Sequence, residues 1–297
     1  MNEKEAKLII KYVVEITEPR WKQYDQHWKN IDKIFILHGY EQGGFEFFKF
    51  APLLENKNIL TINKLGGIID SFEGENKYNR TFAGSLTAQF YIDLQNNKYG
   101  LHGNELFSSI NFFFQKRLGK PGPWFWRTIW QMLICCRYLK NNYSSSFSRY
   151  LFIKYQNYSK KREVNDDTLL SLSSEDWERF KKIAKPWKDL YGIGENVFDF
   201  ILGDIVEANF ASSSFKLDSA NEYFFKVTGI SHLIPTLNRD TVIVFLKKLG
   251  MRYNLREINK GIYTYCSETE SKNYGFCRSR IKCRHCKVNS ICKQALL

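Results

Sequence analysis

The chain has 297 residues, of which 43% are hydrophobic and 16% aromatic, enough apolar material for one large domain or two ordinary ones. Lysine and arginine (44) outnumber aspartate and glutamate (31), and the formal charge of +13 favours a polyanionic partner, either nucleic acid or an anionic membrane surface. The opening residues carry acidic side chains, and no stretch reaches the roughly 18 apolar residues of a membrane helix, so the sequence predicts neither a signal peptide nor a membrane span. We therefore expect a cytoplasmic protein, in a compartment where thiols stay reduced.

Residues 1–117 are predicted to form an N-terminal α+β domain of unknown role. An opening helix is followed by apolar segments with the length and pattern of strands. These segments are 33–39, 58–67 and 87–100, the last with a hairpin turn at Asn96-Asn97.

The proline and glycine cluster at 120–123 changes the character of the sequence and places a domain boundary near residue 118. From there to residue 265 we expect a helical domain. Helices are predicted over 124–140, from the serine run at 144–148, and from Ser173-Ser174 to just before Pro186. The segment 210–235 is less regular and indicates a long loop or a short inserted helix, whereas 239–248 is a compact helix ended by Gly250.

Four of the seven cysteines fall within residues 277–292, with the spacing C-x5-C-x2-C-x5-C. In a reducing compartment such a cluster is typical of a metal site, because neighbouring thiolates from one short loop can surround one ion or cluster. The predicted ligands are Cys277, Cys283, Cys286 and Cys292. A structural zinc ion remains the alternative to an iron–sulfur cluster. His285 is expected on the surface, and Cys266, Cys135 and Cys136 are interpreted as buried thiols without a role in the site.

The segment 189–205 predicts a helix-hairpin-helix. A helix ending at Leu190, a turn through Gly192, Ile193 and Gly194, and a new helix from Glu195 would expose backbone N–H groups that can bind a phosphate oxygen. An ordinary turn between helices has the same pattern.

Asp240 and Thr241 stand at the start of the helix 239–248. Taken alone, the aspartate is explained by helix capping, for which its carboxylate is well suited.

In this order, the glycine hairpin, the Asp-Thr helix start and the cysteines resemble the helix-hairpin-helix DNA glycosylase superfamily, in particular its iron–sulfur branch of endonuclease III and the adenine-mismatch glycosylases. The resemblance covers residues 120–297. It rests on LYGIGENVFDF, RDTVIVFLKKLG and CRHCKVNSIC, which stand where the family has its hairpin, its aspartate helix and its last three cluster ligands. Tyr191 replaces the family's hairpin proline, and the first cysteine interval has five residues where the family usually has six.

The resemblance implies a mainly α, endonuclease III-like fold of residues 118–265 with a [4Fe–4S] cluster loop at 266–297, preceded by the extra N-terminal domain. It implies a monomer that binds double-stranded DNA in the nucleoid, flips one nucleotide out and hydrolyses its N-glycosidic bond. Asp240 would stabilise the oxocarbenium charge of the sugar and orient water. Asn196 occupies the position of the lysine that nicks the strand in bifunctional members, so the resemblance implies a monofunctional enzyme that leaves an abasic site.

DNA contacts are expected from the hairpin and from the cysteine loop, which has no acidic residue between 271 and 297. Arg137 is the candidate for filling the space left by the flipped base, and Trp124, Trp126 and Trp130 are expected in the core. The predicted DNA-binding residues are Gly192, Ile193, Gly194, Arg137, Arg278, Arg280, Lys282 and Arg284.

Two other classes of function fit the same sequence. The chain could be a catalytically silent DNA-binding module of this fold, or a zinc-stabilised RNA-binding protein. The sequence leaves the excised base open, from oxidised, mispaired or uracil bases to bulky modified ones.

Overall fold

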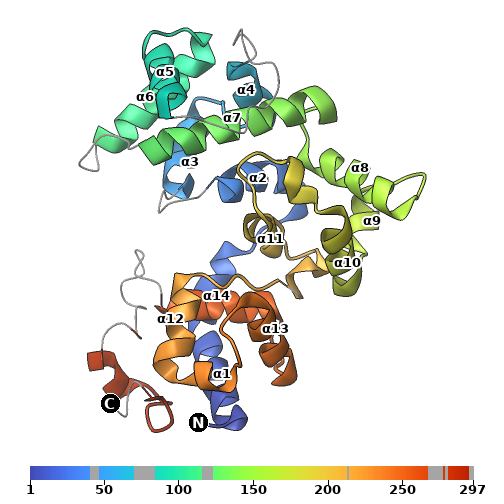
Figure 1. The fold of residues 1–297 in the computed structure, drawn as a ribbon. Coiled ribbons are helices and arrows are strands. Elements are labelled where there is room, and N and C mark those ends of the chain that lie inside the picture. Colours follow the sequence, from blue (N-terminus) through green and yellow to red (C-terminus); the bar gives the residue numbers. More distant parts are fainter. Residues whose placement is uncertain are drawn as a thin grey trace. The chain divides into compact units, whose positions relative to one another are not determined.

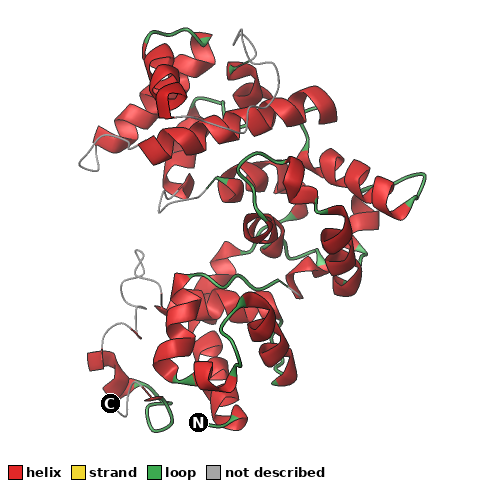
Figure 2. Ribbon diagram, viewed as in Figure 1, coloured by secondary structure: helices red, strands yellow, loops and turns green. Residues whose placement is uncertain are grey.

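The computed structural model of the protein describes residues 1–40, 47–69, 84–115, 123–212, 214–266, 277 and 280–293. In these residues the secondary structure consists of fourteen α-helices and several short 3-10 helices, with no strand (Figures 1 and 2). The predicted mainly α fold class is therefore confirmed. None of the described helices combines the length and the apolar character needed to cross a membrane.

The α+β prediction for the N-terminal region is wrong in the part that the structure describes. The segment 33–39 lies in helix α2 (Ile31–Gly39), 58–67 leads into α4 (Ile62–Ile68), and 87–95 lies in α5 (Gly84–Gln95). The turn expected at Asn96-Asn97 exists, with φ +57° at Asn97, but it joins two helices.

Burial explains why the sequence of α2 resembles that of a strand. Ile34, Phe35 and Ile36 are consecutive and each is at most 1% exposed, and only Asp32 and Lys33 of the nine residues are not buried, so the polar face of the helix is very narrow. A helix with so narrow a polar face has no clear 3.6-residue period to distinguish it from a buried strand.

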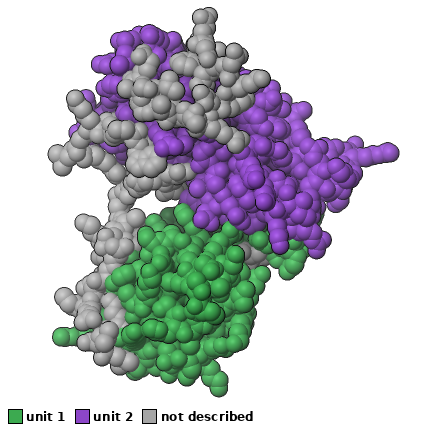
Figure 3. Space-filling model, in the orientation of Figure 1, with its two compact units in different colours: residues 1–27, 171–178, 202–297 green, residues 28–170, 179–201 purple. Residues whose placement is uncertain are grey.

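The chain divides into two compact units, coloured separately in Figure 3. Unit 1 contains residues 1–27, 171–178 and 202–297, and unit 2 contains residues 28–170 and 179–201. The boundary expected near residue 118 lies outside the described residues. Helices from both sides of it, α4 and α7 (Pro123–Tyr143), belong to unit 2.

Unit 1 joins the first helix of the chain to the last ones. Its helices are α1 (Glu3–Trp21), α12 (Ser219–Thr228), α13 (Arg239–Lys248) and α14 (Leu255–Cys266). α1 crosses α14 at Gly261, where an added Cβ would lie 2.9 Å from the Cα of Val14, so the absence of a side chain allows the helices to touch. The indole of Trp21 donates a hydrogen bond to the Val14 carbonyl at 3.1 Å.

The segment 210–235, expected to be a loop or an inserted helix, forms part of the core of unit 1. It comprises the end of η5 (Asn209–Ser212), helix α12 and η6 (Ile230–Leu233). Phe215, Phe224 and Phe225 are fully buried in the same apolar cluster as α1 and α14. The segment is therefore required for the packing of unit 1.

Unit 2 is built around α7. Its helices are α2, α3 (Phe47–Asn56), α4, α5, α6 (Gly100–Gln115), α7, α8 (Phe147–Ser159), α9 (Asp166–Leu170), the second part of α10 (Ser174–Ala184) and most of α11 (Glu195–Gly203). At the crossing of α4 with α7, a Cβ on Gly66 would lie 2.7 Å from the carbonyl of Cys136. Only glycine allows this approach.

The helices predicted beyond residue 120 are confirmed. α7 covers 124–140, α8 is capped by Ser146, whose hydroxyl accepts from the Arg149 N–H at 3.2 Å, and α10 ends before Pro186. Gly250 follows α13 with φ +55°, the left-handed conformation expected after a helix end.

Candidate functional site

The hairpin at 190–194 has the predicted glycine turn. The Ile193 N–H donates to the Leu190 carbonyl at 3.0 Å, and Gly192, with φ +81°, occupies the third position of this turn. The carbonyl of Gly194 then accepts from the Phe198 N–H at 2.9 Å and begins α11. The preceding element differs from the prediction: a short 3-10 helix, η4 (Pro186–Asp189), precedes the turn and α10 ends earlier, at Ala184.

The hairpin is fixed on α2 and α7. Tyr40 donates its hydroxyl to the Tyr191 carbonyl at 3.1 Å, and a Cβ on Gly192 would lie 2.9 Å from Oε1 of Gln131. Cys135, one turn beyond Gln131, lies beneath the same loop. Burial raises the pKa of its thiol to about 12, against the opposing hydrogen bonds from Tyr40 and the Tyr191 backbone. The thiol is therefore protonated at neutral pH and supports the loop by packing.

The start of α11 is open to a ligand. Apart from Gly194 itself and its two chain neighbours, no atom of the described residues lies within 4 Å of a Cβ built on Gly194, and Gly194, Glu195 and Asn196 are all exposed. The first N–H groups of an α-helix have no partner within the helix, so an anion can approach them here.

Asp240 lies in unit 1, in the first turn of α13, but it does not cap the helix. Asn238 is the cap: its Oδ1 accepts from the Thr241 N–H at 3.0 Å, and the Thr241 hydroxyl accepts in return from the Asn238 N–H at 3.3 Å. The Asp240 carboxylate is exposed and makes no hydrogen bond or ion pair with any described residue. The capping explanation for Asp240 is therefore wrong, and the carboxylate is available to a ligand.

The predicted metal ligands lie in unit 1. Cys277 and Cys292 are each 8% exposed in the apolar core, whereas Cys283 and Cys286 are half-buried. The Cys286 N–H donates to the Cys283 carbonyl at 3.1 Å and closes the turn of the C-x2-C pair. A hydrogen bond to Cys266, together with burial, raises the pKa of the Cys277 thiol well above its ordinary value.

The donors suit a soft metal centre by their chemistry, but the described geometry does not assemble the predicted set of four. Among the described His, Cys, Asp and Glu side chains, no group of three or more is arranged to hold a metal ion. Cys277 instead contacts Cys266, which the spacing had left out of the site.

The predicted basic contacts are only partly described. Arg284 and His285 are exposed. Arg280 and Lys282 lie in the 3-10 helix η8 (Arg280–His285), but their side chains, like the whole of Arg278, lie outside the described residues.

Two predictions for α7 concern Arg137 and the tryptophans. Arg137 is half-buried, and its Nη1 donates to the Ile69 carbonyl at 3.1 Å, so the guanidinium holds the end of α4. Trp126 and Trp130 are buried, as expected, and the Trp124 side chain lies outside the description.

The structure thus places the predicted residues in two groups. The hairpin, Asn196 and Arg137 belong to unit 2, and Asp240 belongs to unit 1 with all four predicted cysteine ligands.

A buried ion pair beside the hairpin was missed by sequence reasoning. Nζ of Lys181 in α10 donates to Oδ1 of Asp199 in α11 at 2.9 Å, and the two side chains are only 1% and 2% exposed. The pair joins the helices on either side of the turn. The sequence does contain a signal, because Lys181 follows Trp177 and Phe180 at the spacing of their apolar face.

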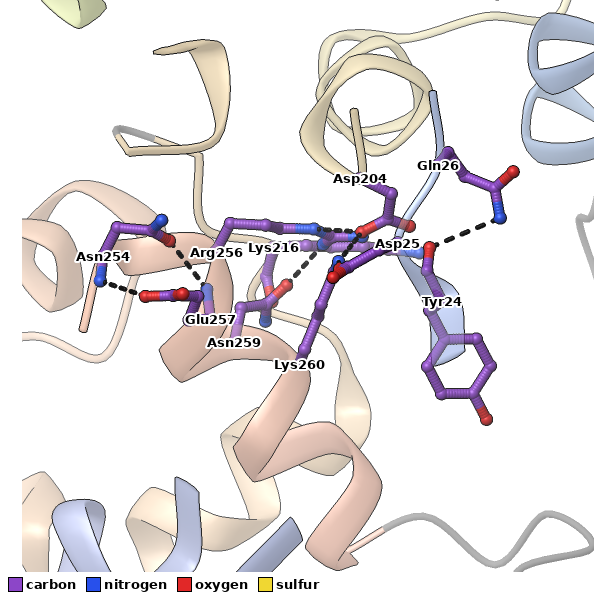
Figure 4. A network of polar contacts seen from close by, with 10 residues as sticks. All are labelled: Tyr24, Asp25, Gln26, Asp204, Lys216, Asn254, Arg256, Glu257, Asn259 and Lys260. Atoms are coloured by element: carbon purple, nitrogen blue, oxygen red, sulfur yellow. Dashed lines mark hydrogen bonds and ion pairs between the residues drawn. The ribbon is translucent and has the colours of Figure 1, made fainter. Parts of the chain in front are cut away.

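Unit 1 contains a second buried network, centred on Asp204 (Figure 4). Arg256 donates to Asp204 through Nε at 2.9 Å and lies 2.7 Å away through Nη2, and Lys260 bridges Asp204 at 3.0 Å and Asp25 at 2.8 Å. The backbone joins the same segments, since the Gln26 N–H donates to the Asp204 carbonyl at 2.7 Å. The network therefore links the residues that follow α1 to α14 and to the residue that follows α11.

Comparison with protein-family models, with curated proteins and with solved structures finds no match to this chain.

Proposed function

We propose that the protein is a monofunctional DNA glycosylase, which flips a base out of duplex DNA and hydrolyses its N-glycosidic bond. The observation that carries the proposal is the hairpin: Gly192 in the left-handed conformation leads into α11, whose exposed N-terminus has open space at Gly194. A helix start of this kind binds a DNA phosphate through backbone N–H groups without reading sequence. The formal charge of +13 favours the same partner.

Asp240 is the proposed catalytic carboxylate. Cleavage of an N-glycosidic bond develops positive charge on the sugar, and a carboxylate that is desolvated by bound DNA stabilises that charge and orients water. Support comes from its exposure and its lack of partners among the described residues, since a carboxylate used as a helix cap would not be available.

Asn196 explains the proposed absence of strand cleavage. Its amide cannot form a Schiff base with the sugar, which the lysine of bifunctional enzymes does. A metal centre in the cysteine segment would hold that basic segment rigid when bound, and no step of the hydrolysis passes through it.

The decisive experiment compares Asp240→Asn with wild type on duplexes carrying a broad panel of damaged, mispaired and modified bases. Excision, read as abasic sites, is expected to fall at least about 100-fold because an oriented charge is lost, while DNA affinity is retained. Asp167→Asn is the matched control, since Asp167 is also an exposed aspartate in the first turn of a helix, α9. Undiminished excision by Asp240→Asn would remove this residue from catalysis.

The same panel tests the alternatives. Tight DNA binding by wild type with no excision of any base would identify a silent DNA-binding module. Preference for RNA over duplex DNA in competition would identify an RNA-binding protein instead.

A further inference from the structure

The four cysteines of the C-terminal segment differ in their access to solvent. Cys277 and Cys292 lie in the apolar core of unit 1 and are each 8% exposed, whereas Cys283 and Cys286 are half-buried. The C-x2-C pair, Cys283 and Cys286, is therefore the part of this set that a reagent in solution can reach.

The backbone places the C-x2-C pair in a tight turn. Cys283 lies in the 3-10 helix η8, and the Cys286 N–H donates to the Cys283 carbonyl at 3.1 Å, so the two residues occupy positions i and i+3 of one turn. Side chains at these positions of a 3-10 helix eclipse each other. Such a turn holds the two Cα atoms within about 7 Å, and a disulfide joins Cα atoms about 4.4–6.8 Å apart. The reduced pair and a disulfide therefore fit the same turn of the backbone.

Unit 1 holds this turn on its core. The hydroxyl of Tyr265, a core residue of α14, lies 3.7 Å from Sγ of Cys286, within hydrogen-bonding reach of a sulfur atom. Beyond the pair, the Cys292 N–H donates to the Val288 carbonyl at 3.1 Å, and Val288 and Ile291 pack against the same core. Packing and hydrogen bonds therefore fix the position of the pair on unit 1.

The charge around the pair favours an anionic reagent. Arg284 and His285 lie between the two cysteines, Lys287 follows them, and all three are exposed. The sequence has no acidic residue from 271 to 297. A basic surface raises the local concentration of anions. Among small disulfides, glutathione disulfide is an anion at neutral pH, because its carboxylates outnumber its amino groups.

We propose that Cys283 and Cys286 form a thiol–disulfide exchange site whose oxidant is an anionic low-molecular-weight disulfide of the glutathione type. In a reducing compartment such a protein disulfide is transient and serves sensing or catalysis. The exchange site takes the place of a metal centre, for which the described cysteines are not arranged. It does not depend on the proposed glycosylase function, since no step of the hydrolysis passes through the cysteines.

The exchange takes place in two steps. The thiolate of one cysteine attacks a sulfur atom of glutathione disulfide, so that a mixed disulfide forms and one glutathione leaves, taking up the proton that the cysteine gave up. The second cysteine attacks the protein sulfur of the mixed disulfide and releases the other glutathione in the same way. Two electrons and two protons thus pass from the protein thiols to the small disulfide, which becomes two glutathione molecules.

The test mixes the reduced protein with glutathione disulfide, blocks the remaining thiols with an alkylating reagent at successive times and maps the bonds by mass spectrometry. A disulfide between Cys283 and Cys286 is expected to form at least about 10-fold faster than any bond at the buried cysteines, and reduced glutathione should reverse it. Earlier formation of a different disulfide, or a pair that stays reduced while the unfolded protein is fully oxidised, would refute the proposal.

Serine variants separate the two steps. In Cys283→Ser or Cys286→Ser only the first step remains, so the other cysteine is expected to retain one bound glutathione. Cys136→Ala, which removes a buried thiol of unit 2, is the matched control and should form the disulfide at the wild-type rate. A single variant that passes its glutathione bond on to another cysteine would show that the pair is not the exchanging unit.

The charge of the oxidant is tested by comparing glutathione disulfide with uncharged hydroxyethyl disulfide. The ratio of the two oxidation rates is expected to fall about 3-fold or more in Arg284→Gln/Lys287→Gln, because the attraction of an anion is weakened. Lys160→Gln, at an exposed lysine of unit 2, is the control. An unchanged ratio would refute an anionic oxidant.

Anaerobic incubation of the reduced protein with iron and sulfide, or with zinc, tests the rival assignment. Metal uptake that is lost in Cys277→Ala as well as in Cys283→Ser would assign the pair to a metal centre and overturn the exchange site. Base excision is measured separately with the Asp240→Asn comparison, so failure of the exchange site is distinguishable from failure of the proposed function.

Discussion

At the scale of single residues, unit 2 contains a buried ion pair of Lys181 with Asp199 that is costly to disrupt. Both charges are removed from water, and they lie 2.9 Å from each other. Removal of one partner of such a pair costs more stability than replacement of both partners by apolar residues, because the remaining charge then stays buried without its partner.

We predict that Lys181→Met lowers the free energy of unfolding by about 3–5 kcal/mol. The double variant Lys181→Met/Asp199→Leu should recover most of this loss, since no charge remains buried. Urea unfolding monitored by circular dichroism measures both, with the exposed Lys182→Met as control. A double variant as unstable as the single one would show that packing, and not the uncompensated charge, causes the loss.

Asp240 shows what sequence reasoning can and cannot establish about a single residue. The motif correctly predicted a helix start at 239 and an acidic residue in its first turn. The partner of each backbone N–H depends on local geometry, however, and Asn238 rather than Asp240 provides the cap. Neighbouring residues can both match a capping motif, so the sequence alone does not show which side chain accepts from the backbone N–H groups and which stays exposed.

At the scale of elements, long helices with recognisable ends were predictable and short buried helices were not. α7, α10 and α13 carry apolar residues at helical spacing and recognisable ends, and each is confirmed. α2 and α4 are short and largely buried, so they resemble strands in composition. The missing information was which faces the neighbouring helices cover.

The crossing of α4 with α7 depends on one glycine. Gly66 lies near the end of the segment 58–67, which was predicted to be a strand, but a Cβ there would meet the Cys136 backbone at 2.7 Å. We predict that Gly66→Ala lowers the free energy of unfolding of unit 2 by about 1–3 kcal/mol, because a backbone neighbour cannot move aside as a side chain can. Gly194→Ala, with open space around its Cβ, is the control and should leave stability within about 0.5 kcal/mol.

The experiment for Gly66 is thermal unfolding of both variants at equal concentration. Equal midpoints for Gly66→Ala and wild type would mean that α4 can shift on α7 without loss. Such a result would mean that the crossing of α4 with α7 does not require a glycine.

At the scale of the whole molecule, unit 1 depends on segments that are far apart in sequence. α1 packs on α14 at Gly261, and Lys260 in α14 binds Asp25 just beyond α1. Neither contact follows from local patterns, which is why sequence analysis assigned residues 1–117 to a separate domain. The network of Asp204 escaped prediction for the same reason.

We predict that deletion of residues 1–27 unfolds unit 1 and leaves unit 2 folded. The deletion removes the apolar surface of α1 and leaves Lys260 without Asp25. Hydrogen exchange followed by mass spectrometry should show fast exchange in α14 and continued protection in α7. Protection of α14 in the deleted protein would show that α12, α13 and α14 suffice for a stable unit.

The composition of unit 1 also has a consequence for biosynthesis. A ribosome makes α14 roughly 240 residues after α1, so at about 5–20 residues per second α1 waits for tens of seconds before its packing partner emerges. During this interval the apolar side of α1 has no native cover, whereas nearly all of unit 2 is already synthesised.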